Sequence, residues 1–216
     1  MRFLGLALLV LSSGCGFTNP GGGTRTLWVN AQLSTDGSTA GSRARVSVKL
    51  GSSNGDVVRN AEVAIRGGPL ARTVVPFDDQ RLDYRLDGFT WADGIRLEVI
   101  RGTDLVDGSI DAPGATVITL PVANTTFSRG AGMPFIVRWK DEHGVVAKST
   151  TLHLDKAKID QTLPPGALEQ SLDPNTLVVG NEKVSVERSN EVELAGGASG
   201  STLSAGTRHE IEFKVE

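Results

Sequence analysis

The sequence predicts an all-β protein with two antiparallel β-sandwich domains, and three observations point to it. Short stretches in which apolar and polar residues alternate with a period of two recur along the chain, as is typical of half-buried strands. Asp-Gly and Asn-Gly pairs stand between many of these stretches, and such pairs readily adopt the positive dihedral angles of tight turns. No stretch keeps an apolar period of 3.6 residues over three helical turns, which argues against a helical fold.

The first half of the chain supplies the strands of one sandwich. We expect strands at residues 27–33, 46–50, 62–65 and 95–99. We expect tight turns at Asp36-Gly37, Asn54-Gly55, Asp87-Gly88, Asp93-Gly94 and Asp107-Gly108. Short strands separated by turns at this spacing are typical of an antiparallel sandwich.

The second half supplies another set of strands. We expect them at residues 116–120, 134–140, 149–154, 176–179, 183–188 and 208–216. The last of these carries an apolar face of Ile211, Phe213 and Val215. Trp28 and Trp139 stand within alternating stretches, so both are expected in cores.

The two sets meet at Asp111-Ala112-Pro113-Gly114, which is the best candidate for a domain junction. We therefore place a first domain at residues 25–114 and a second at 115–216. Domains of about 100 residues can bury a core without disulfide bonds.

The first residues have the composition of an export signal. Met1-Arg2 carries a positive charge, residues 3–11 are apolar apart from one glycine, and the small residues Ser12-Ser13-Gly14 follow. This order matches a signal peptide over residues 1–14. Cys15, the only cysteine of the chain, comes directly after it.

Residues 11–15, Leu-Ser-Ser-Gly-Cys, resemble the lipobox of bacterial lipoproteins. The resemblance implies cleavage before Cys15 and acylation of that cysteine with chains such as palmitate, which together hold a protein stably on a membrane. Gly16 stands where an aspartate retains some lipoproteins at the inner membrane, so the resemblance implies the outer membrane and leaves open on which face. Residues 15–24 would form a flexible tether, since they are rich in glycine.

Two further resemblances concern the sandwiches. Residues 60–65 and 84–99 resemble the transthyretin-like, or carboxypeptidase-regulatory, β-sandwich, with an Ala-x-Val-x-Ile strand ahead of an aromatic strand and a glycine turn. Residues 118–130 and 136–139 resemble immunoglobulin-like modules of bacterial surface proteins. Both imply sandwich folds, and neither transfers a catalytic residue.

Composition and charge narrow the range of partners. The formal net charge is −3 at pH 7, whereas nucleic acids and anionic lipids favour a basic surface. We therefore expect no nucleic acid partner. The glycine-rich residues 196–201 lack the lysine of a phosphate-binding loop and are expected to join the last strands.

Titratable residues give weak signals for chemistry. His143 follows Asp141 and Glu142 and would be the base of a hydrolase, but the segment is better interpreted as a hairpin turn. Five aspartates suggest calcium by their number but match no calcium-loop spacing and alternate with Arg81 and Arg85, so we expect solvated turns with local ion pairs. They are Asp78, Asp79, Asp83, Asp87 and Asp93. We expect no metal, no cofactor and no enzymatic activity.

Phe89 and Trp91 form the one candidate ligand contact. They stand two residues apart between Asp-Gly turns, where aromatic rings at a sandwich rim could stack on sugars; packing in the core is the favoured alternative. The sequence thus predicts a lipoprotein of the cell envelope that acts as a non-catalytic protein-interaction or assembly module. A surface glycan-binding protein that uses Phe89 and Trp91 is the alternative.

Overall fold

The computed structural model describes residues 24–36, 41–69, 72–142 and 145–216. The predicted all-β fold class is confirmed, because two short 3-10 turns, Arg129–Ala131 and Pro174–Thr176, are the only helical elements in these ranges. The strands are β1 Leu27–Thr35, β2 Arg43–Leu50, β3 Glu62–Gly67, β4 Thr73–Val74, β5 Phe77–Asp78, β6 Asp83–Asp87, β7 Gly94–Arg101, β8 Asp104–Asp111, β9 Thr116–Leu120, β10 Thr126–Phe127, β11 Phe135–Asp141, β12 Ser149–Leu154, β13 Ile159–Leu163, β14 Glu169–Leu172, β15 Gly180–Glu193 and β16 Thr202–Val215. None of the elements described is a helix long and apolar enough to cross a membrane.

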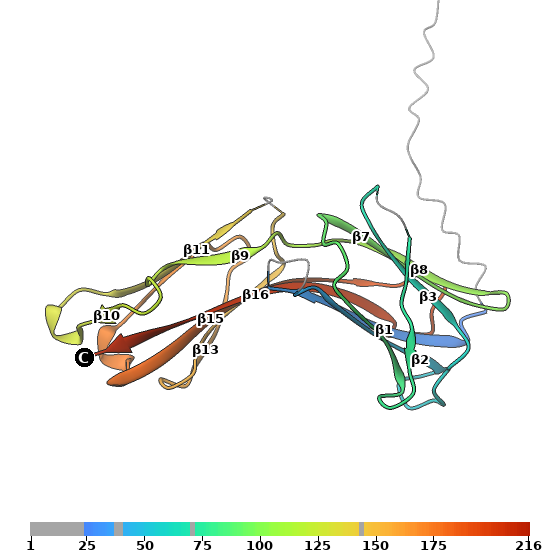
Figure 1. Ribbon diagram of the computed structural model, residues 1–216, viewed down its shortest axis with the longest axis horizontal. Coiled ribbons are helices and arrows are strands. Elements are labelled where there is room, and N and C mark those ends of the chain that lie inside the picture. Colours follow the sequence, from blue (N-terminus) through green and yellow to red (C-terminus); the bar gives the residue numbers. More distant parts are fainter. Residues whose placement is uncertain (1–23, 37–40, 70–71, 143–144) are drawn as a thin grey trace, which may run out of the picture.

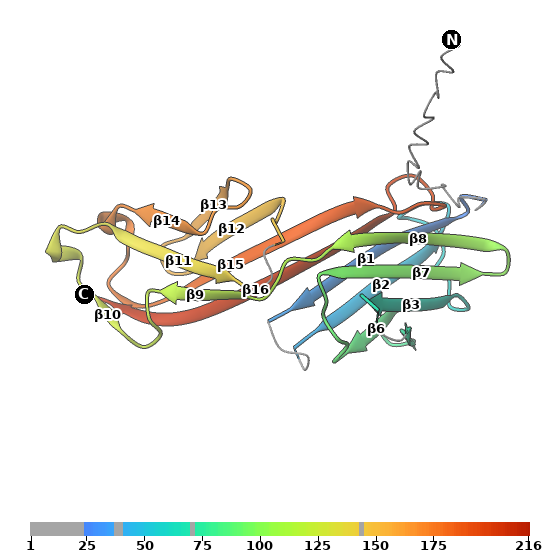
Figure 2. The same ribbon diagram turned by 90° about the horizontal axis from the view of Figure 1, so that it is seen from above.

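One large sheet runs through the whole molecule. Its strands follow the order β13-β12-β15-β16-β1-β2-β6-β5, and β10 also pairs with β16. Two small sheets, β4-β3-β7-β8 and β14-β11-β9, pack over it. Figures 1 and 2 show these small sheets side by side, each over one half of the large sheet. We call each half, with its small sheet, a lobe.

Each lobe has its own hydrophobic core. The first core lies under β3, β7 and β8, with Leu97, Val99 and Ile95 among its fully buried side chains. The second lies under β9 and β11 and includes Trp139 at 2% exposure, so the predicted core position of Trp139 is confirmed. Trp28 does not lie in a core as expected; it is half-buried on the other face of β1, with Lys49 over its ring.

The C-terminal hairpin β15–β16 belongs to both lobes. All fourteen residues of each strand pair, from Gly180 opposite Val215 to Glu193 opposite Thr202. Near its loop the hairpin gives Leu194, Leu203 and Ala205 to the first core. At its other end Val184, Val186, Phe213 and Val215 enter the second core. The boundary near residue 114 stays a prediction, and residues that follow it complete the first core.

The hairpin loop is held on the first lobe. Ala198 N donates to Leu27 O, and Ser201 Oγ accepts from Val29 N. Gly196 has a φ of +72°, and a Cβ there would lie 2.2 Å from Leu105 O. Only glycine fits so close to β8 in this conformation. The expected loop over residues 196–201 is therefore confirmed.

A buried polar layer separates the two cores, and we call the part of the molecule at this layer the waist. On β15 the inward positions between the cores are Arg188 and Asn190, and on β16 they are Thr207 and His209. Both hydrophobic clusters lie on the same face of the large sheet, because inward residues keep the same parity along each strand. The opposite face, which none of the described sheets covers, is called the outer face.

Arg188 is the largest polar side chain in this layer, at 1% exposure. Its Nη1 lies 2.9 Å from Asp141 Oδ2 on β11, which ties the two sheets of the second lobe together. Thr150 and Thr207 flank it on the neighbouring strands. The Thr207 hydroxyl is 2.7 Å from that of Thr116 on β9.

Residues 176–179 were expected to form a strand and do not. Asp173 caps a 3-10 turn at Pro174–Thr176 through a hydrogen bond from Asn175 N. Proline fixes the backbone for such a turn and cannot donate to a strand. The next strand begins only at Gly180.

Candidate binding cleft at the waist

The outer face at the waist is built from small polar side chains. Strand alternation turns Gln32 and Ser34 of β1, Ser204 of β16 and Ser189 of β15 away from the cores. In the sheet register Gln32 lies opposite Ser204, and Ser34 lies opposite Gly206. Short side chains along these positions leave the backbone of the central strands accessible from this side.

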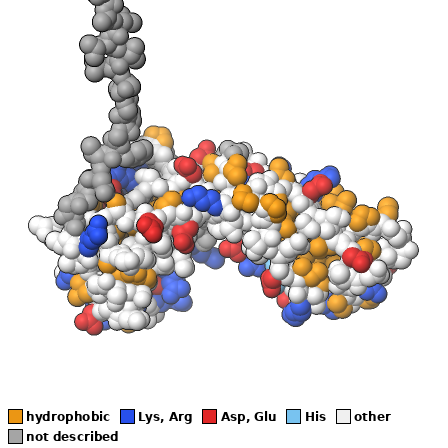
Figure 3. Space-filling view, turned by 180° about the vertical axis from the view of Figure 1, so that it is seen from behind, with side chains coloured by type: hydrophobic (Ala, Val, Ile, Leu, Met, Phe, Trp, Pro, Cys, Tyr) orange, Lys and Arg blue, Asp and Glu red, His pale blue; other side chains and the backbone are white. Residues whose placement is uncertain are grey.

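A cleft of about 980 Å³ lies on this face. It is lined by the polar residues just described together with Arg43, Glu187, Arg208 and Glu210. Figure 3 shows the molecule as an arch that is hollowed between the two lobes. The four strands that line the cleft, β1, β2, β15 and β16, all belong to the large sheet.

Charged side chains of both signs lie in the cleft and on the strand residues next to it. Arg208 Nη2 lies 3.0 Å from Glu210 Oε2, and Lys183 Nζ lies 3.0 Å from Glu212 Oε1. The hydrogen bonds of Lys183 with Glu212 and Glu210 raise the pKa of the lysine. These side chains are about half exposed. Breaking such exposed ion pairs costs little free energy, so a partner can form ion pairs of its own with these residues.

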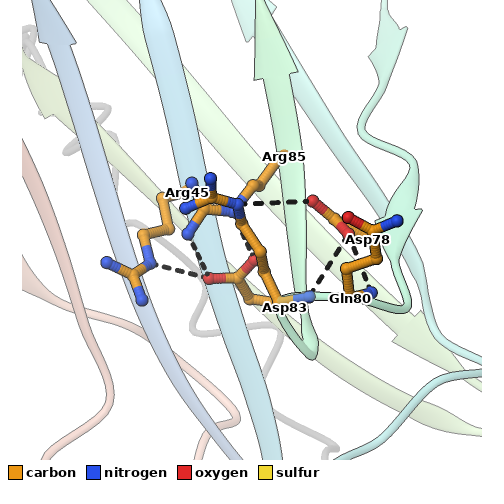
Figure 4. Close-up of polar contacts among 6 residues, drawn as sticks. Arg45, Asp78, Gln80, Asp83 and Arg85 are labelled. Carbon is orange, nitrogen blue, oxygen red and sulfur yellow. Dashed lines mark hydrogen bonds and ion pairs between the residues drawn. The ribbon is translucent and has the colours of Figure 1, made fainter.

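An arginine and carboxylate cluster flanks the cleft on β2 and β6 (Figure 4). Asp83 is 2% exposed and accepts from Arg45 Nε at 2.7 Å and from Arg85 Nε at 2.6 Å. Burial alone would raise the pKa of Asp83, but the hydrogen bonds from Arg85 and Arg45 outweigh it and the pKa is lowered. Asp78 accepts from the backbone N–H groups of Gln80 and Arg81. This cluster holds Arg45 and Arg85 in place beside the cleft.

His209 lies below the cleft, on the inner side of β16. Its Nδ1 accepts from the backbone N–H of Ile118 at 3.2 Å. Burial lowers the pKa of His209, and the negative charge of Asp36 opposes that effect. The neutral imidazole therefore links β16 to the small sheet of the second lobe.

The two aromatic residues predicted as a ligand contact are not among the residues that line the cleft. Phe89 is 5% exposed and belongs to the first core. Trp91 is half-buried, packs 6.0 Å from the Phe89 ring, and donates through Nε1 to Pro113 O at 2.9 Å. This placement favours the packing interpretation, and a ligand contact at these rings stays a prediction.

The remaining predicted site residues are the lipidation site, the histidine of the hydrolase alternative and the acidic residues. Cys15 and His143 lie outside the described residues. Asp141 is paired with Arg188, and its side chain is 9% exposed. Within the described ranges, no group of three or more histidines, cysteines, aspartates or glutamates could hold a metal ion. Asp79 and Asp83 make the expected ion pairs, with Arg59 and Arg85. The expectation of a solvated turn is wrong for Asp83, which lies on β6 and is 2% exposed.

The cleft itself was not found by sequence reasoning. It joins residues 32–36, Gly41 and Arg43 to residues between 187 and 210, which are about 150 positions apart in the chain. The only sequence signal was the run of serines and charged residues at alternate positions, which is the pattern of any solvated sheet face.

Comparison with known proteins adds no assignment, since no family model matches the chain and no curated protein matches it.

Proposed function

We propose that the protein is a lipid-anchored protein of the bacterial cell envelope that acts as a non-catalytic interaction module, and that it binds a partner protein on the outer face of the waist. The observation that carries the proposal is the cleft on the face of the central strands that neither of the two small sheets covers. Interaction sites on β proteins commonly use such faces and edges.

The construction of the waist supports binding with little rearrangement. The floor of the cleft is the hairpin β15–β16, whose ends are fixed in two separate cores. Clefts formed on rigid elements lose little conformational entropy on binding. Serine and glutamine side chains with charges of both signs suit a polar protein surface.

The N-terminal residues support the anchor. Cys15 in its lipobox-like context would carry the acyl chains, and residues 15–24 would link it to β1. Tethering on the outer membrane raises the concentration of the module near other envelope proteins. The resemblance of residues 118–130 and 136–139 to immunoglobulin-like surface modules agrees with a binding role.

The binding proposal is tested by co-purification. The full-length protein with a C-terminal tag is expressed in its own organism, solubilised gently, and its companions are identified by mass spectrometry. We expect one partner protein in stoichiometric amount. We expect that partner to be lost when the cleft is filled by Ser34→Arg with Ser189→Arg, and kept in the control Asp79→Arg, whose side chain is 79% exposed on another part of the first lobe.

Two outcomes would contradict the binding proposal. If the variant with Ser34→Arg and Ser189→Arg still co-purifies with the partner, binding takes place elsewhere on the molecule. Reproducible recovery of envelope polysaccharide without a protein would favour the glycan-binding alternative.

The anchor is tested separately with Cys15→Ala. We expect the wild-type protein to sediment with outer membranes and to incorporate a labelled fatty acid. The variant should do neither. Labelling that persists in the variant would overturn the assignment of Cys15.

A further inference from the structure

β16 has a gap along one of its edges. β1 pairs with it in parallel from Thr202 to Thr207, and β10 pairs with it in parallel from Lys214 to Val215. Between these partners, residues 208–213 pair with β15 alone among the described strands. Asn124 N donates to Glu212 O at 2.8 Å and closes the far end. The open segment is therefore residues 208–212.

Strand alternation identifies the backbone groups that face the gap. Glu212 O accepts from Asn124, and Lys214 N donates to Thr125 O, so even-numbered residues direct their backbone groups toward this edge. The odd-numbered residues direct theirs toward β15. Arg208 O, Glu210 N, Glu210 O and Glu212 N consequently lie along the gap, and no hydrogen bond from the described residues to these four groups is found.

The gap opens onto the cleft at the waist. Arg208, His209 and Glu210 line that cleft, and Glu212 lines a second depression of about 230 Å³ next to β10. The gap can therefore be reached from the outer face along its whole length. It spans about 16 Å at the rise of roughly 3.3 Å per strand residue.

The two sides of the gap differ in polarity. On the outer side stand the charged side chains of Arg208, Glu210 and Glu212, which are exposed. On the inner side stand His209 and Ile211, which are half-buried, and Ile211 packs against the second core. A chain lying in the gap would place alternate side chains against these two environments.

We propose that an extended segment of the partner protein adds to β16 as a short strand in this gap, with apolar side chains directed inward beside Ile211 and polar side chains directed outward. A peptide backbone is the occupant because the gap presents alternating donors and acceptors at strand spacing, which another strand satisfies in register. Four backbone hydrogen bonds would form, and the segment would complete the sheet between β1 and β10. This inference rests on the proposed function and specifies its binding mode.

A proline at position 210 provides the sharpest test. Glu210→Pro removes a donor that faces the gap and no hydrogen bond to β15, since proline is tolerated where a strand N–H faces outward. Glu210→Ala is the matched control, because it removes the same ion pairs with Arg208 and Lys183 and keeps the N–H. The probe is a phage-displayed library of random nine-residue peptides, selected on the full-length wild-type protein.

We expect enriched peptides with alternating apolar residues that bind Glu210→Pro at least tenfold more weakly than Glu210→Ala. In the wild-type protein their binding should slow amide exchange at Glu210 and Glu212, a measurement that does not depend on how the proline variant folds. No enrichment, equal binding to the two variants, or unchanged exchange at these amides would overturn the proposal. Self-association of the protein that Glu210→Pro abolishes would also overturn it, because the occupant would then be a second copy.

The same two variants separate this inference from the proposed function. In the co-purification experiment, the partner could be retained by Glu210→Pro and lost from the variant with Ser34→Arg and Ser189→Arg. That result would support the interaction module and exclude strand addition. Loss of the partner from Glu210→Pro but not from Glu210→Ala would support both.

Discussion

At the scale of single residues, two buried charged groups lie at and beside the waist, Arg188 and Asp83. Arg188 and Asp141 form an ion pair with almost no exposed side-chain surface, at 2% and 9%. Asp83 is equally buried, but its partners Arg45 and Arg85 reach solvent, with 57% and 32% of their side chains exposed. The first pair joins two sheets, and the second orders the border of the cleft.

We predict that Arg188→Ala lowers the free energy of unfolding by about 3–5 kcal/mol, because it removes the buried guanidinium that pairs with the Asp141 carboxylate. Urea unfolding measures the change. The control is Arg138→Ala, which breaks an exposed pair with Glu169 and should cost no more than about 1 kcal/mol. Equal costs for the two variants would show that the buried pair does not support the waist.

Asp83 should make stability depend on pH in acid. Its folded pKa lies below the ordinary value of about 4, so its contribution is fully present above that value and is lost as the pH falls through the lower folded pKa. We predict that Asp83→Asn costs about 1–3 kcal/mol at pH 7 and clearly less at pH 3. The measurement is urea unfolding at both pH values.

Asp79→Asn serves as the control for Asp83, since Asp79 makes one exposed ion pair with Arg59. It should change stability little at either pH. A cost for Asp83→Asn that is the same at pH 3 and pH 7 would contradict the account of this carboxylate.

At the scale of elements, the two edges of β16 differ in how much of their backbone is paired. The edge toward β15 is paired over fourteen residues, whereas the other edge is shared by β1, the gap and β10. Side chains follow the same alternation throughout, so only the backbone distinguishes the gap from the paired segments.

This difference predicts opposite responses to proline at adjacent positions. Ile211→Pro removes a backbone hydrogen bond to β15 and should destabilise the protein by about 3 kcal/mol or more beyond Ile211→Ala. Glu210→Pro should cost much less beyond Glu210→Ala, because its N–H faces the gap. Thermal unfolding of the four variants checks this, and similar penalties at both positions would mean that residue 210 is paired on that side.

Sequence reasoning succeeded where a strand is defined by its own alternation. Residues 27–33, 95–99 and 149–154 fall within β1, β7 and β12, since the period of two is local information. The prediction that Trp28 lies in a core was wrong, because alternation alone does not indicate which face of a strand is buried. Sequence reasoning also failed for residues 176–179, where the turn chemistry of Asp173 and Pro174 prevails over apolar content. The tight turn expected at Asp107-Gly108 is wrong as well, because both residues lie within β8 and pair with β7.

At the scale of the whole molecule, the shared hairpin makes two cores depend on one element. β16 contributes Leu203 to the first core and Phe213 to the second. The sequence could not reveal this, because the alternation of residues 208–216 is the same whichever core they enter. The parallel pairing of β1 with β16 joins residues more than 170 positions apart, and such pairings leave no local trace. The contact between Asp83 and Arg45 and the cleft also join residues that are distant in the chain, so the local sequence does not predict them either.

The shared hairpin predicts that the lobes unfold together. Leu203→Ala should cost about 2–5 kcal/mol and should lower the amide protection of β11 and β12 in the second lobe by as much as that of β3 and β7 in the first. Hydrogen exchange followed by mass spectrometry makes the comparison, and Phe213→Ala is the reciprocal variant. A loss of protection confined to the mutated lobe would show that the lobes are independent.

The central claim is that the outer face of the waist meets a partner protein, and site-specific photo-crosslinking in living cells tests it most directly. A photoreactive amino acid is placed at Ser34, which is exposed at the cleft, and, as a control, at the exposed Asp79. The account predicts one discrete crosslinked protein from position 34 and none from position 79. No product from position 34, or the same products from both positions, would contradict it.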